Sequence, residues 1–465
     1  MTQPGMEFQL IFGLVLAILI LIFLVVKTKV HAVVALVIAA SIAGLIGGMM
    51  PADVIGSITK GFGATLSTIG LVIGFGVMMG RILEVSGAAE RMAYTLIRWL
   101  GEKREDWALM VTGYVVSIPI FCDSAFVILS PLVKALARTT GKSVLTLGIC
   151  LAAGLVLTHH AVPPTPGPLG VAGIYDVDVG LMILWGVVFT IPSTFVVVAY
   201  ARYIGPRLET MIKADTGEDI GAAYREFKEA AAVREADLPP LGVSVAPIAV
   251  PILLILVNTV TTFAVKASGD AALAKSLGVQ VASFIGNPVV AVAIGVLLAV
   301  YTLVPRRPRE EVIADLEKGV ESAGIILLVT GAGGALGAVL RDSGAGTVIG
   351  NSVAGLAMPA ILIPFVIATL VRLIQGSGTV AMITGASISA PILAAIPGVD
   401  MVFAAQAAAI GSMCCGYFND SYFWVINRIL GVKNAKHQMI LWSVPTTLAW
   451  ATSLVTLLIA NAIFG

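Results

Sequence analysis

Long apolar runs separated by short charged segments limit what this chain can fold into. Residues 8–26, 30–50 and 62–83 are three such runs, each close to the roughly 20 residues with which a helix crosses a bilayer. Only 12% of the residues are charged, against about 25% in soluble domains. A water-soluble fold could not cover its surface with so few charges. The sequence therefore predicts an all-α polytopic membrane protein.

Charge and cysteine content argue against several other classes. The 28 Lys and Arg residues against 27 Asp and Glu give a net charge of +1, so no basic surplus indicates a nucleic-acid partner. The four cysteines lie in apolar stretches without metal-ligand spacing and are expected to be buried thiols, so neither a metal nor a cofactor is expected. The first nine residues hold no Lys or Arg, whereas a signal peptide needs a positive start. We expect the first apolar run to remain as a membrane helix.

The two halves of the chain follow the same pattern, which predicts an internal duplication. Gly76 and Gly333 are 257 residues apart, and so are Gly154 and Gly411. Spans, breaks and charged segments also recur in the same order. The longest polar stretch lies between the halves, which gives a first repeat over residues 1–200, a cytoplasmic linker over 201–245 and a second repeat over 246–465.

Basic residues set the expected orientation, because cytoplasmic loops are enriched in Lys and Arg. They fall on both sides of residues 107–133, so we expect this segment to enter the membrane and return as a re-entrant hairpin. The first repeat then has about five crossings, an odd number that inverts the second repeat. Each inverted repeat is expected to have about five transmembrane helices, a re-entrant hairpin (107–133 and 361–396) and an interrupted helix (143–168 and 401–427). This organisation is typical of secondary transporters.

Four interruptions at membrane depth form the expected substrate site. Half-helix starts present free backbone N–H groups that attract anions, and hydroxyl and amide side chains beside them add donors. This chemistry suits an anionic, hydroxyl-bearing solute. The duplication also pairs Ser124 with the neighbourhood of Ser377, so we expect the two hairpin tips to share one site. The predicted substrate-binding residues are Asp123, Ser124, His159, Gly376, Ser377, Gly378, Thr379, Asn419 and Asp420.

Proton coupling is expected from Asp123, Asp420 or His159. A carboxylate at membrane depth is costly and marks a pathway, and histidine exchanges protons near neutral pH. The alternative is structural: the carboxylates hold the shape of the breaks, and a neutral imidazole of His159 or His160 caps freed carbonyls. Arg372 either pairs with a substrate carboxylate or extends to the outer interface.

Several motifs resemble those of one transporter family. They are Phe121-Cys-Asp-Ser in the first hairpin, Thr158-His159 with the proline run 163–168, Gly376-Ser-Gly-Thr-Val380, and Asn419-Asp420. Over nearly its whole length the sequence resembles the gluconate permease (GntP) family of bacterial proton symporters for sugar acids. The resemblance implies a multi-pass protein of the bacterial inner membrane, with a scaffold domain, a mobile transport domain and a homodimeric assembly.

Two departures from the family pattern concern the substrate. Familiar members have a glutamate where this chain has Asp123, and a histidine where it has Thr165. The expected function is proton-coupled uptake of gluconate or a related small hydroxylated monocarboxylate. The alternative is a sodium-coupled carrier of a related organic anion or of D-serine. A membrane enzyme or a receptor is disfavoured, because the sequence has neither a catalytic constellation nor a sizeable soluble domain.

Overall fold

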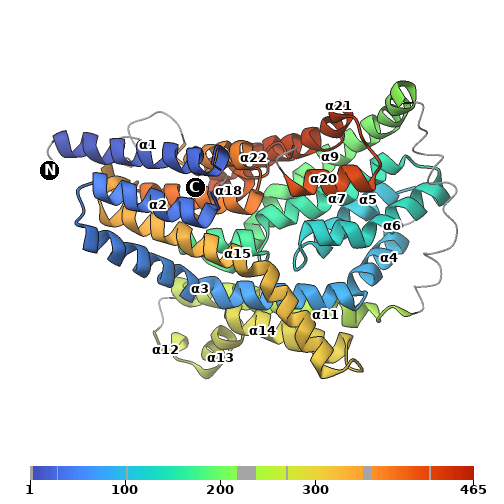
Figure 1. The fold of residues 1–465 in the computed structure, drawn as a ribbon. Coiled ribbons are helices and arrows are strands. Elements are labelled where there is room, and N and C mark those ends of the chain that lie inside the picture. The colour runs from blue at the N-terminus through green and yellow to red at the C-terminus, as the bar shows by residue number, and fades with distance from the viewer. Residues whose placement is uncertain are drawn as a thin grey trace.

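The computed structural model describes residues 4–28, 30–100, 103–216, 237–268, 271–348, 359–417 and 420–465. These parts contain helices and turns and no strand (Figure 1). Five of the described helices are long and apolar enough to cross a membrane, or seven if each of two bent pairs is one span. The all-α polytopic prediction is confirmed.

The helices of the first half follow the predicted spans and breaks closely. In chain order the elements are α1 (Pro4–Val26), α2 (Ala32–Ile46), α3 (Pro51–Val85), α4 (Ala88–Leu100), α5 (Glu105–Val116), α6 (Cys122–Thr140), α7 (Val144–Ala161), α8 (Pro166–Tyr175) and α9 (Val179–Thr216). Gly47 and Gly48 separate α2 from α3, Ser86 and Gly87 separate α3 from α4, and the amphipathic helix α4 precedes the first predicted hairpin.

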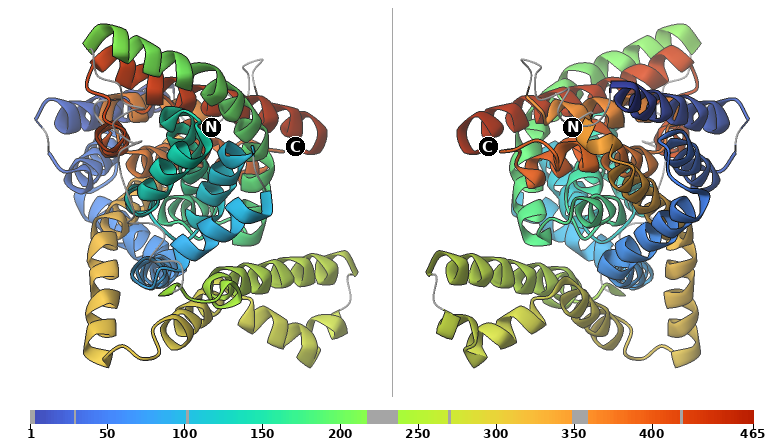
Figure 2. Two further views of the ribbon diagram at one scale, coloured as in Figure 1. Left: turned by 90° about the vertical axis from the view of Figure 1, so that its right-hand side faces the viewer. Right: turned by 90° about the vertical axis from the view of Figure 1, so that its left-hand side faces the viewer.

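The second half begins with a group of helices that Figure 2 shows as a layer set apart from the rest of the molecule. This layer consists of α11 (Leu241–Ser268), α12 (Ala271–Ala274), α13 (Leu277–Ile285), α14 (Pro288–Leu298) and the π-helical turn η2 (Ala299–Leu303). The remaining elements are α15 (Arg309–Asp342), α17 (Leu362–Gln375), α18 (Gly378–Leu393), α19 (Met401–Gly411), α20 (Ser421–Ile429), α21 (Ala435–Gln438), η3 (Met439–Ser443) and α22 (Val444–Phe464).

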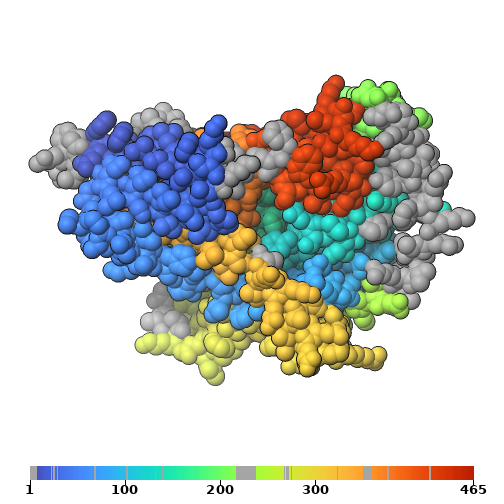
Figure 3. Space-filling model, viewed as in Figure 1, coloured from blue at the N-terminus to red at the C-terminus, as the bar shows by residue number. Residues whose placement is uncertain are grey.

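We call α5–α6 and α17–α18 the first and second hairpin, and α7–α8 and α19–α20 the first and second broken helix. Every residue of α7 is buried, as expected for a helix that is apolar on all sides. The long helices α3 and α15 pack along each other, and α3, α4 and α9 contact the α11–α14 layer. In the space-filling view α1–α3 cover one end of the visible face, and C-terminal residues cover much of the other (Figure 3).

Glycine brings each broken helix close to the hairpin of its own half. A Cβ at Gly154 in α7 would lie 2.1 Å from the Met110 carbonyl oxygen in α5, and a Cβ at Gly411 in α19 would lie 2.4 Å from the Phe365 carbonyl oxygen in α17. The two glycines are the pair that the shift of 257 residues aligns. Their matching roles support the internal duplication, whose inverted orientation stays a prediction.

Some helices extend beyond their predicted spans: α3 begins at Pro51, before residue 62, where its predicted span begins. Helix α9 continues to Thr216, well past residue 200, where we placed the start of the linker. Tertiary contacts hold this extension: Gly205 lies against Thr146 of α7, and Arg202 pairs with the buried Asp106 at the start of α5. Residues 217–236 of the predicted linker lie outside the described residues.

Candidate functional site

The starts of four helices lie next to one another where the hairpins and broken helices are interrupted. Helix α6 begins after a turn that contains Pro119, and α8 begins after Pro163 and Pro164, which are joined by a cis peptide bond. Gly376 separates α17 from α18 in the left-handed conformation, with φ at +91°, which favours glycine. Helix α20 packs against α6, and α18 packs against α8. Elements from both halves therefore meet at these breaks.

Arg372 and Asp420 form a buried ion pair between the second hairpin and the second broken helix. Arg372 Nη2 lies 2.6 Å from Asp420 Oδ2, and only 3% of the arginine side chain is exposed. The guanidinium also donates to the carbonyl oxygens of Gly376 and of Cys414, the latter at 3.4 Å. One side chain thus satisfies carbonyls that the helix breaks leave without partners. The alternative in which Arg372 extends to the membrane interface is wrong.

Asp420 has a second role at the start of α20. Its Oδ1 accepts a hydrogen bond from the Tyr422 backbone N–H at 3.2 Å, which makes it the N-cap of this helix. The carboxylate is therefore held on one oxygen by a helix start and on the other by Arg372. The adjacent Asn419, also a predicted site residue, lies outside the described residues.

Asp123 lies in the first turn of α6 and contacts the second broken helix. Ser421 Oγ donates to Asp123 Oδ2 at 3.4 Å, and the Cys122 thiol donates to Oδ1 at 3.7 Å. Both contacts are weak, and in the described part of the chain no cation lies within ion-pair distance of this carboxylate. Ser421 thus follows Asp420 in the chain and contacts Asp123, and of the two carboxylates Asp420 alone has an ion-pair partner among the described residues.

The two histidines lie side by side at the end of α7, with their ring centroids 5.6 Å apart. His160 Nδ1 lies 3.0 Å from the Val156 carbonyl oxygen, an acceptor, so this nitrogen carries the proton in a neutral ring. His160 Nε2 and His159 Nδ1 are buried and have no hydrogen-bond partner among the described residues. The two histidines therefore place two ring nitrogens without a hydrogen-bond partner among the described residues at the site. The sequence analysis had predicted only His159 as a substrate-binding residue.

His160 faces the start of α18. A Cβ at Gly378 would lie 2.1 Å from His160 Nε2, so any larger residue here would displace the buried His160 ring. Ser377 is the N-cap of α18, with its Oγ 3.4 Å from the Val380 backbone nitrogen. Thr379 lies near the start of α8, because its methyl group would be 3.6 Å from a Cβ at Gly167. The second hairpin tip and the first broken helix are thus in contact.

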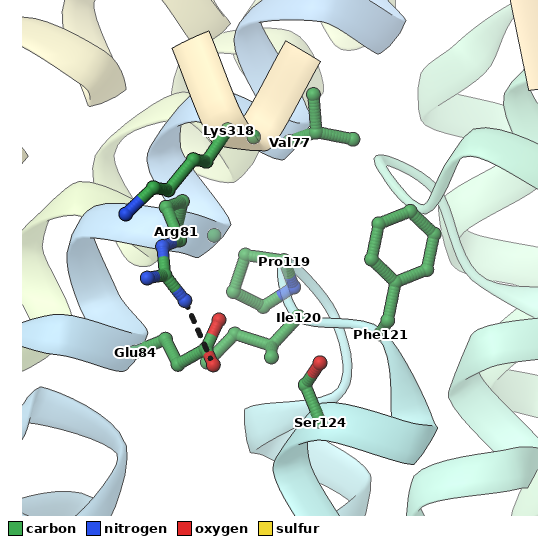
Figure 4. A pocket seen from close by; sticks show the side chains of 10 residues that line it. Val77, Arg81, Glu84, Pro119, Ile120, Phe121, Ser124 and Lys318 are labelled. Atoms are coloured by element: carbon green, nitrogen blue, oxygen red, sulfur yellow. Dashed lines mark ion pairs between the residues drawn. The ribbon is translucent and has the colours of Figure 1, made fainter. Parts of the chain in front are cut away.

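Ser124 has different neighbours from the other predicted site residues. It lines a cavity of about 230 Å³ between the start of α6 and helices α3 and α15 (Figure 4). The structure therefore brings Asp123, Asp420, His159, Gly376, Ser377, Gly378 and Thr379 toward the helix starts, and gives Ser124 a position on the side that faces α3.

Buried charges among interrupted helices in an all-helical membrane protein are features of a solute transporter. The chain belongs to the GntP permease family: the model of the GntP family permeases matches residues 9–463. It is a multi-pass protein of the inner membrane and a permease, not an enzyme.

Known proteins support this assignment at different levels. An uncharacterized permease of Haemophilus influenzae is 55% identical over 90% of this chain and 85% of its own length. The gluconate permease of Pseudomonas aeruginosa is 32% identical over 89% of both chains. The solved structure of MtrF from Neisseria gonorrhoeae, one of a class of antimetabolite efflux pumps, matches with a TM-score of 0.65 at 14% identity and covers 96% of this chain and 97% of MtrF. The last likeness concerns the fold alone.

Proposed function

We propose that this permease is a proton symporter that carries gluconate, or a related small hydroxylated monocarboxylate, into the cell. Relatives named gluconate permease support the substrate class. The observation that carries the coupling proposal is a count of charges at the helix starts. Arg372 contributes one positive charge, which Asp420 balances, and Asp123 adds a carboxylate that has no ion-pair partner among the described residues.

This count links substrate binding to protonation. With Asp123 ionised, the site carries a net negative charge and repels an anionic substrate. With Asp123 protonated, the side chains are balanced, and the partial positive charges of the helix starts favour a carboxylate. A proton on Asp123 therefore precedes or accompanies the substrate, which gives one proton for each monocarboxylate.

Asp420 is a weaker candidate for the coupling proton. A proton there would leave the guanidinium of Arg372 as a buried charge without its partner, at a cost of several kcal/mol. His159 is a candidate for binding the substrate hydroxyls, because its Nδ1 is buried and unsatisfied. A substrate hydroxyl reaching this nitrogen would supply the missing hydrogen bond.

Uptake by purified protein in proteoliposomes tests the proposal. An inward pH gradient should drive accumulation of radiolabelled gluconate without sodium, and a sodium gradient at equal pH should not. Accumulation driven by sodium alone would overturn proton coupling. Uptake of D-serine without uptake of sugar acids would overturn the substrate class.

Asp123→Asn separates coupling from binding. The amide keeps the shape of the side chain and mimics the protonated state, so counterflow exchange of gluconate should continue while accumulation against a gradient is lost. The control is Asp53→Asn, at an exposed position in the first turn of α3, which should retain accumulation. Full accumulation by Asp123→Asn would remove this residue from the coupling mechanism.

The homodimer expected from the family stays part of the proposal. Large apolar side chains on α11 and α13 are exposed, with Phe263 at 74%, Leu277 at 77% and Phe284 at 67%. A second copy or lipid must cover such a surface. The mass of the detergent-purified protein by light scattering distinguishes the two coverings.

A further inference from the structure

The cavity beside Ser124 is built from both halves of the chain. Arg81, Glu84 and Val77 of α3 and Lys318 of α15 form one side, and the turn that leads into α6 forms the other (Figure 4). The Pro119 carbonyl oxygen lies directly on α3, since a Cβ at Gly80 would be only 2.2 Å from it. The cavity is therefore fixed at the junction between the first hairpin and α3.

Its lining carries a positive charge. Arg81 lies 3.1 Å from Glu84 and 3.4 Å from Asp315, and Asp315 is itself paired with Arg307 at 2.8 Å. The Nε atom of Arg81 is buried without a hydrogen-bond partner among the described residues. Lys318 has no ion-pair partner within the described part of the chain. Arg81 is thus paired with carboxylates, and Lys318 supplies the positive charge of the lining that no carboxylate of the described residues pairs with.

The hairpin side adds hydrogen-bond donors. Ser124 Oγ faces the cavity (Figure 4). Phe121, the N-cap of α6, offers no side-chain acceptor, so the first backbone N–H groups of this helix lack a side-chain cap. The cavity is thus surrounded by a hydroxyl, a helix start, a guanidinium and an ammonium. Groups of these kinds bind small carboxylates in proteins.

Phe121 connects the cavity to the central helix starts. It lines the cavity, and its ring centroid lies 6.0 Å from that of His159. A single aromatic side chain therefore lies between the cavity and the histidine pair. By the positive-inside prediction, the nearby Arg307 places the cavity toward the cytoplasm.

We propose that this cavity is a second, weaker binding site for the carboxylate of the transported acid, occupied between the central site and the cytoplasm. The ligand class rests on the proposed function, whereas the positive charge of the cavity does not. The site predicts that Lys318 and Ser124 act on substrate at the cytoplasmic side and leave binding from the outside unchanged.

Charged thiol reagents test the cavity independently of transport. A cysteine in place of Ser124 should react faster with an anionic than with a cationic methanethiosulfonate, relative to the background of the parent protein with its native cysteines. Adding Lys318→Gln should slow the anionic reagent and accelerate the cationic one by about 5-fold each, as expected for the loss of one unit charge near a solvated site, so the rate ratio should fall by about 25-fold. Lys275→Gln, an exposed lysine beyond α12, is the matched control and should leave the ratio unchanged.

Ligand protection identifies what the cavity binds. Gluconate should slow the labelling of Ser124→Cys at concentrations above its half-saturation for uptake, and inorganic phosphate at equal concentration should protect less. Equal protection by phosphate would overturn the assignment to the substrate. An unreactive Ser124→Cys, or a ratio that Lys318→Gln does not move, would overturn the cavity as an anion site even in an active transporter.

Transport kinetics of Lys318→Gln give a second measurement that needs no introduced cysteine. In inside-out vesicles the half-saturation for gluconate should rise by roughly 5-fold, as for the loss of one unit charge, while in right-side-out vesicles it should stay unchanged. An equal change on both sides would assign Lys318 to the central site or to folding instead. Absence of gluconate transport by the native protein would contradict the proposed function, and the reagent ratio would still decide whether the cavity attracts anions.

Discussion

Removing either partner of the Arg372–Asp420 ion pair should destabilise the protein strongly, and removing both should cost less than the sum of the two single losses. Loss of one member of a buried pair typically costs about 3–5 kcal/mol, because the remaining charge stays buried without compensation. Asp420→Asn keeps a good N-cap for α20, so its cost is mainly electrostatic. Arg372→Met additionally leaves the carbonyl oxygens of Gly376 and Cys414 without this donor, at about 1–3 kcal/mol each. The expected order of destabilisation is Arg372→Met above Asp420→Asn.

A double-mutant cycle measures the interaction. The free energy of unfolding is obtained by detergent titration of purified wild type, both single variants and the double variant. The double variant should be at least about 2 kcal/mol more stable than the sum of the two single losses predicts. An interaction energy of this size lies within the range measured for contacting residues. Additivity within about 0.5 kcal/mol would refute the ion pair. Arg341→Met, at an exposed pair with Asp342, is the control and should change stability by less than about 1 kcal/mol.

Two further predictions concern the close packing of α18 and the charged cluster at the start of α5. Gly378→Ala should abolish gluconate uptake, because its Cβ would displace His160, whereas Gly63→Ala, with open space around it, should retain uptake in the same vesicle assay. Burial by itself raises the pKa of Glu105, but the Lys142 ammonium at 2.8 Å helps to leave that pKa below its ordinary value of 4.5. The contribution of ionised Glu105 to stability is then complete above about pH 4.5 and is lost as the pH falls through the lowered pKa. Lys142→Gln should therefore lower the unfolding temperature at neutral pH and match the wild-type unfolding temperature in acid. Equal unfolding temperatures of the two proteins at neutral pH would contradict this.

Most of the helical organisation could be predicted because its causes are local. An apolar run of bilayer length must satisfy its backbone internally, and only a helix does so within one segment. Proline and glycine interrupt the runs where the structure has its breaks, for example at Pro119 and Gly376. The extension of α9 was missed because it depends on Gly205 fitting against Thr146, a contact between distant segments that hydropathy does not encode.

The candidate site was predicted less completely than the fold, because residue type does not specify partners. The sequence identified Arg372 and Asp420 separately, but they are 48 residues apart and meet only after the second hairpin packs on the second broken helix. His160 was ranked below His159 although adjacent helical residues point in different directions. What decided its position was a glycine at 378 that leaves room for the ring.

The predicted duplication would make the two halves equivalent, and the differences between them carry the proposed mechanism. Both halves place an aspartate near a helix start, but only Asp420 has an arginine beside it, whereas Asp123 has a serine hydroxyl and a thiol. If both aspartates were paired with arginines, the charge of the site would not respond to protons, and if both lacked a cation, the site would repel an anion strongly. With Asp420 paired and Asp123 unpaired among the described residues, a single carboxylate controls the net charge of the site. The proposed proton coupling therefore depends on a departure from the symmetry that the predicted duplication would impose.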